Sequence, residues 1–129
     1  MKVLPADHAD VQDIAYCRNR LEDRLEDPSL IDAGVVVVMG PERHLAVPIG
    51  GRRRGGCIPV PTIRSGLAVR RALVDRRGFP ALRVRWSVYP DTCHVVEWGE
   101  ALPTTYDDAV RGRFYGYTPR AVARFIQEG

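Results

Sequence analysis

The chain has 129 residues, of which 45% are hydrophobic and 27% are charged, and its formal net charge is +3. This length suits one compact domain with a single core, and the mixture of apolar and charged residues argues against an intrinsically disordered chain. The longest strongly apolar run, residues 35–39, is too short to cross a bilayer, so we expect no membrane partner.

A first helix is predicted over about residues 8–26. Asp7 suits its N-cap, because the carboxylate can accept a free backbone N–H of the first turn. Apolar residues then recur at helical spacing as far as Leu25. Pro28 ends the helix, since the residue before a proline is disfavoured in helical geometry.

Three β segments are expected next. Two of them, at about 34–39 and 44–49, are joined by residues 40–43 and have the spacing of a hairpin with a short loop. Residues 50–56, which we call the glycine–arginine segment, then lead into an extended stretch at 57–61. Two prolines confine that stretch to the edge of a sheet, because proline cannot donate to the ladder.

A second helix is predicted over about residues 63–76, with Thr62 as its cap. Its apolar residues fall on one broad arc of the helix. Gly78 suits the C-terminal end, and Pro80 prevents the helix from continuing.

The next β segment, at about 82–88, has the clearest alternation in the chain. Leu82, Val84, Trp86 and Val88 alternate with polar residues, which predicts one buried and one solvated face. A turn at 90–92 returns the chain through residues 94–98. A three-residue loop predicts four cross-strand pairs: Trp86 with Val96, Val84 with Trp98, Val88 with His94, and Arg85 with Glu97.

The C-terminal part is predicted to be helical. A short helix is expected near residues 106–111, and Thr118 with Pro119 indicates the start of a last helix. The order of elements predicts a single α+β domain over residues 1–129. It has an antiparallel sheet of two hairpins plus an edge strand, with helices packed mainly on one face.

Charge is distributed unevenly along the chain. Residues 34–86 contain eleven arginines and two acidic residues, a net of +9, whereas residues 1–33 sum to −4 and residues 87–129 to −2. A focused positive field of this kind attracts phosphates. The three cysteines, Cys17, Cys57 and Cys93, are odd in number and have no paired spacing, so we expect no disulfide framework and a cytoplasmic location.

The glycine–arginine segment is the first candidate site. Its glycines permit close approach of the backbone, and three adjacent guanidinium groups supply charge and hydrogen bonds to a phosphate. The alternative interpretation of this segment is a solvated loop without a ligand. Arg83 and Arg85 could also contact phosphates from one sheet face, but an exposed strand paired with Glu97 is the favoured interpretation of these two residues. The candidate phosphate-binding residues are Arg52, Arg53, Arg54, Arg64, Arg71, Arg83 and Arg85.

Two further clusters carry chemistry in principle. The first consists of Asp91, Cys93, His94 and Glu97, which are close in sequence. On a strand His94 points away from Cys93 and Glu97, so these side chains cannot all reach one ion. We therefore expect no metal site, no catalysis and no cofactor. Residues 111–117 interleave aromatic rings with arginine. Bases can stack on such rings, although packing between helix and sheet is the favoured use.

Three segments, residues 47–56, 83–99 and 112–117, resemble a family of small uncharacterised actinomycete proteins. The likeness covers most of residues 30–127. The family has no established activity, and its members are often encoded on integrative and conjugative elements. The resemblance therefore implies a genetic setting, which favours an accessory or regulatory role around DNA.

The sequence thus predicts a small, non-enzymatic module that binds DNA, RNA or another polyanion through its arginines. A self-associating protein-interaction module, with acidic flanks pairing to the basic centre of another copy, is the alternative. A small enzyme acting on a phosphorylated or nucleotide ligand through Cys93, His94 or Glu97 is a second alternative.

Overall fold

The computed structural model describes residues 1–88 and 93–128. Twelve elements occur in this part of the chain: β1 (Lys2–Pro5), η1 (Ala6–His8), α1 (Val11–Leu21), η2 (Pro28–Ala33), β2 (Val35–Met39), β3 (Glu42–Ala46), β4 (Gly55–Val60), α2 (Ile63–Leu73), β5 (Arg83–Arg85), β6 (His94–Gly99), α3 (Asp108–Phe114) and α4 (Pro119–Glu128). The α+β class is confirmed.

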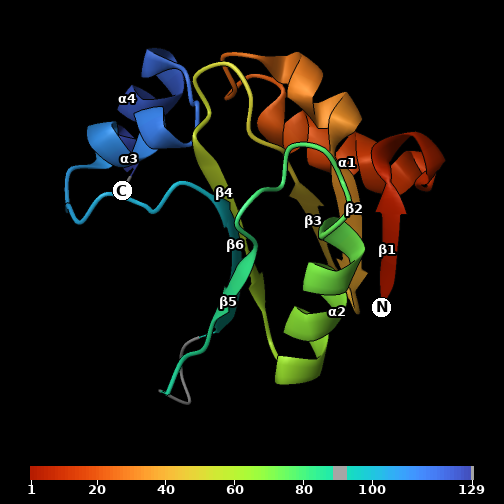
Figure 1. Cartoon of the computed structure of the whole chain (residues 1–129). Helices are drawn as coiled ribbons and strands as arrows, with labels where there is room; N and C mark the ends of the chain where they lie inside the picture. Colours follow the sequence, from red (N-terminus) through yellow and green to blue (C-terminus); the bar gives the residue numbers. More distant parts are fainter. Residues whose placement is uncertain (89–92, 129) are drawn as a thin grey trace.

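The strands form two antiparallel sheets of three strands each, in the orders β1-β2-β3 and β4-β6-β5. Figure 1 shows α1 beside the first sheet, α2 against the second, and α3 with α4 together at the far end of the second sheet. One core joins the two sheets and α2. Its members include Val37 of β2, Ile58 of β4, Leu73 of α2, and Val96 and Trp98 of β6.

Several local predictions are confirmed. The β2–β3 hairpin is present, β4 lies at a sheet edge, and α2 begins after Thr62, whose Oγ1 accepts from the Ser65 backbone N–H at 3.0 Å. The hairpin loop is shorter than expected, because β3 begins at Glu42 and leaves two residues between the strands. The start of α4 is also confirmed, since Thr118 Oγ1 accepts from the Ala121 N–H at 3.1 Å.

The N-terminal region differs from the prediction. Residues 2–5 form a strand, β1, that was not predicted, and Asp10 rather than Asp7 caps the first helix by accepting from the Gln12 N–H at 2.8 Å. The chain is held against β2 as far as Ala6, whose N–H donates to the Gly34 carbonyl at 2.9 Å. The helix therefore starts later, and it ends at Leu21.

The predicted register of the second hairpin is wrong by two residues. Val84 pairs with Val96, and Arg83 lies opposite Glu97. The side chain of Arg83 donates to the carbonyl of Gly99, the last residue of β6, and to that of Glu100, which follows it. These bonds hold β5 in this register. The turn predicted at residues 90–92 lies outside the described residues.

Because of this two-residue shift in register, the apolar face that packs against the core ends at Val84 and does not continue to Trp86 and Val88. Trp86 is 43% exposed and Val88 is 87% exposed. The Trp86 ring lies over Gly66 of α2, where an added Cβ would be only 3.4 Å from ring carbons. Trp86 therefore covers the surface of α2 instead of entering the core.

Candidate functional site

The glycine–arginine segment is a tight turn that leads into β4. The N–H of Arg53 donates to the Gly50 carbonyl at 2.9 Å, and the Gly50 N–H donates to the Arg53 carbonyl at 3.2 Å. Gly51 has φ +53°, a left-handed conformation that favours glycine. This geometry sends the three adjacent arginines in different directions.

Arg53 points into the protein and is only 8% exposed. Its Nε donates to the Val47 carbonyl at 3.3 Å and its Nη1 to the Tyr115 carbonyl at 2.8 Å, while the guanidinium carbon lies 5.9 Å from the centre of the Tyr115 ring. Burial lowers the pKa of this guanidinium from its usual value. The expectation that Arg53 faces a phosphate needs correction, because its donors serve the protein's own carbonyls.

Arg52 and Arg54 remain on the surface. Arg52 Nε lies 3.7 Å from Glu26 Oε2, and Arg54 Nη1 lies 3.2 Å from Glu100 Oε2. Both arginine side chains are mostly exposed, so these are weak surface pairs that a phosphate can compete with.

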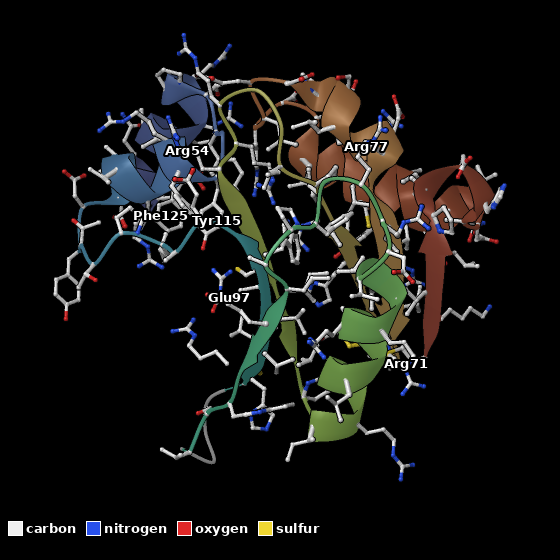
Figure 2. All side chains as sticks on the ribbon, in the orientation of Figure 1. Arg54, Arg71, Arg77, Glu97, Tyr115 and Phe125 are labelled. Atoms are coloured by element: carbon white, nitrogen blue, oxygen red, sulfur yellow. The ribbon has the colours of Figure 1, made fainter. Side chains whose placement is uncertain are left out.

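The other four predicted arginines lie on two different faces. Arg83 and Arg85 flank Glu97 on the outer face of β5 and β6, with Nε–Oε1 distances of 3.7 and 3.5 Å. Arg64 and Arg71 are exposed on α2, and their side chains form no hydrogen bond or ion pair within the described residues. Figure 2 shows Arg71 on α2 on one side of the second sheet and Glu97 on the other. The seven residues therefore do not form one surface.

A cavity that the prediction did not identify lies between α3 and α4. Its volume is about 320 Å³, and we call it the α3–α4 cavity. Its lining combines three arginines, two carboxylates and a mainly apolar and aromatic wall: Arg24, Arg111, Arg124, Asp108, Glu128, Gly112, Tyr115, Tyr117, Ala121, Val122 and Phe125. Figure 2 shows the labelled Tyr115 and Phe125 on this side of the molecule.

The cations of this cavity are unpaired. Within residues 1–88 and 93–128, Arg24, Arg111 and Arg124 form no ion pair. Neither Asp108 nor Glu128 pairs with a cation in the same part of the chain. These charged groups are thus available to a ligand.

Local sequence explains how α3 and α4 come together. Asp107 caps α3 by accepting from the Ala109 N–H at 2.9 Å, and Thr118 caps α4. Gly112 allows close contact between the helices, because a Cβ there would lie 2.4 Å from Cγ2 of Val122. Gly116, with φ +75°, turns the chain between them.

Backbone hydrogen bonds attach this helix pair to the rest of the domain. The Arg54 N–H donates to the Phe114 carbonyl at 2.9 Å, and the Glu26 N–H donates to the Gly116 carbonyl at 2.8 Å. The Thr118 N–H donates to the Arg24 carbonyl at 2.8 Å, which brings Arg24 from the end of α1 to the cavity.

A second cavity, of about 200 Å³, adjoins the first and shares Arg24 and Tyr117 with it. Its lining includes Arg43, which pairs with Asp13, as well as the buried Arg53. Its cations are thus more fully engaged than those of the α3–α4 cavity.

In the described part of the cluster at residues 91–97, His94 and Glu97 lie on opposite faces of β6, as expected. The Ser87 N–H donates to His94 Nδ1 at 2.9 Å, and the His94 ring packs edge-on against Trp86. Glu97 is engaged by arginines on the outer face, and neither cavity includes Cys93, His94 or Glu97. Asp91 lies outside the described residues. Among the others, no group of three or more His, Cys, Asp or Glu residues is placed to hold a metal ion.

The sequence contained a partial signal for the cavity. Residues 111–117 interleave aromatic rings with arginine, and Arg111, Tyr115 and Tyr117 do line the cavity. Arg24 lies within the acidic N-terminal stretch, so the net charge of that stretch does not indicate a cation available to a ligand. Its role depends on a contact between residues 24 and 118 that no local pattern indicates.

Comparison with known proteins gives one match. A model described as a family of unknown function (DUF6302) matches residues 5–129. No curated protein and no solved structure matches the chain. No helix in the described residues is long and apolar enough to span a membrane.

The different roles of Arg53 and Arg54 can be tested by stability. Arg53→Met keeps most of the buried volume but leaves the Tyr115 carbonyl without its donor, so we expect a loss of about 1–3 kcal/mol in the free energy of unfolding. The matched change Arg54→Met removes only an exposed pair and is expected to cost less than about 1 kcal/mol. Urea denaturation followed by circular dichroism measures both. Equal stability of Arg53→Met and the wild type would contradict the structural role of Arg53.

Proposed function

The chain belongs to this family of unknown function, and we propose that it is a small, non-enzymatic module that binds nucleic acid through the end of the domain formed by α3 and α4. The cations at this end include Arg24, Arg111 and Arg124 around the cavity, with Arg52 and Arg54 on the adjoining turn. Phosphates supply most of the affinity in such a complex.

The observation that carries the proposal is the convergence of three unpaired arginines from separate parts of the chain. Arg24 follows α1, Arg111 belongs to α3, and Arg124 belongs to α4. All three arginines are exposed, and they outnumber the two carboxylates of the same lining, so an anionic ligand is attracted to this end of the domain. The cavity distinguishes this end from α2, where Arg64 and Arg71 lie on the exposed face of the helix and line neither cavity.

The genetic setting that the sequence resemblance implies is consistent with this proposal. The resemblance to actinomycete proteins encoded on integrative and conjugative elements favours an accessory or regulatory role around DNA. A small basic module suits such a role.

Self-association is the second candidate, and one feature favours it. Ile63 and Leu67 of α2 are 56% and 49% exposed, and Trp86 and Val88 after β5 are 43% and 87% exposed. Trp86 lies over Gly66, next to Leu67 in the chain. These four side chains give an apolar surface that a second copy can cover.

Light scattering tests this second candidate. If the apolar surface drives association, the mass in solution is expected to exceed that of the 14.4 kDa monomer and to persist at high salt. Leu67→Ser is expected to reduce that mass. A monomer at all protein and salt concentrations would exclude self-association, and dissociation by salt would point to charge pairing instead.

The nucleic-acid proposal is tested with a pair of double variants that remove the same charge. Arg111→Gln/Arg124→Gln is expected to weaken binding of labelled DNA about tenfold or more at low salt, because two phosphate contacts are lost. Each lost contact is also expected to lower the slope of log K against log salt concentration by about 1. The control, Arg64→Gln/Arg71→Gln on α2, is expected to change affinity by less than about twofold. Fluorescence anisotropy across a salt titration, with single-stranded and duplex DNA, measures both. Absence of binding at low salt would end the proposal, and equal losses in both variants would assign binding to net charge.

A further inference from the structure

Resting on the proposed function, we infer that the α3–α4 cavity holds one unstacked base of a single-stranded nucleic acid. The cavity volume of about 320 Å³ falls at the lower end of the range of about 300–1,000 Å³ for small-molecule pockets. A base within a duplex is stacked and paired, so it cannot enter such a pocket unless it leaves the helix. The inferred partner is therefore a single strand.

The aromatic wall supplies stacking surfaces. Tyr115 and Tyr117 lie with their ring centres 6.2 Å apart at one part of the lining, and Phe125 comes from α4. Phe125 is 62% exposed even though it lines the cavity. An exposed ring at the mouth of a cavity is a suitable partner for the face of a base, because every base has a π-face.

The polar lining favours a nucleotide unit over a bare phosphate. Arg24, Arg111 and Arg124 attract the phosphates on either side of a base, whereas Asp108 and Glu128 repel them. Carboxylates do accept hydrogen bonds from exocyclic amino groups, such as N4 of cytosine. A ligand with an anionic backbone and an amino-bearing ring satisfies both kinds of group.

The contacts of the partly buried Tyr115 support a rigid wall. Its phenol lies 3.7 Å from Cys57 Sγ, and its carbonyl accepts from Arg53. Burial raises the pKa of this phenol above its usual value, so the hydroxyl stays neutral at physiological pH. A wall that is held in place and uncharged needs little reorganisation when a base enters.

The experiment compares two strands that carry the same backbone charge. One is a cytidine oligodeoxynucleotide of about twelve residues, and the other is an abasic strand of equal length. Fluorescence anisotropy at low salt is expected to show about tenfold tighter binding of the cytidine strand by the wild-type protein. Phe125→Ala is expected to abolish this preference while leaving the affinity for the abasic strand unchanged.

Ile126→Ala is the matched control. Ile126 adjoins Phe125, is 52% exposed and does not line the cavity, so its removal is expected to preserve the preference for bases. Equal binding of both strands by the wild type would overturn the base site and leave the nucleic-acid proposal standing. Failure to bind either strand, and duplex DNA as well, would overturn the proposed function itself. If Phe125→Ala does not fold, the comparison of the cytidine and abasic strands with the wild-type protein still tests the base site.

Discussion

The buried guanidinium of Arg53 is the interaction on which the arrangement of this domain depends. A cation withdrawn from water must find acceptors inside the protein, and here they come from two distant places: Val47 after β3 and Tyr115 after α3. The neighbouring glycines pack against the same residue. A Cβ at Gly56 would lie 2.6 Å from Arg53 Nη2 and 2.5 Å from the Trp98 ring, and one at Gly116 would lie 2.8 Å from Arg53 Cβ. One side chain thus joins a turn, the end of the first sheet and the chain between the last two helices.

This constraint changes the interpretation of the charge-rich centre. Three adjacent arginines between glycines suggest a ligand-binding loop, yet the turn buries the middle arginine and leaves Arg52 and Arg54 on the surface. Fastening the α3–α4 pair to this turn and to the end of α1 then brings Arg24, Arg111 and Arg124 to one cavity. The cations best placed for a ligand therefore lie in parts of the chain that are acidic on average.

The features that the sequence predicts well are those with local causes. Thr62 and Thr118 cap helices through bonds to residues three positions away, and the β2–β3 hairpin needs only its own turn. The register of β5 against β6 depends instead on Arg83 reaching the carbonyls of Gly99 and Glu100, which alternation alone does not reveal. The burial of Arg53 and the place of Arg24 likewise depend on contacts across most of the chain, so no spacing rule indicates them.

The most direct test of the account is to map where a nucleic acid contacts the protein by NMR, titrating a ¹⁵N-labelled sample with a short cytidine oligodeoxynucleotide. We expect amide shifts to concentrate at Arg24, in α3 and in residues 121–125 of α4, with α2 and the outer face of β5 and β6 unchanged. Shifts centred on Arg64 and Arg71, or on Arg83 and Arg85, with α3 and α4 unaffected, would contradict it.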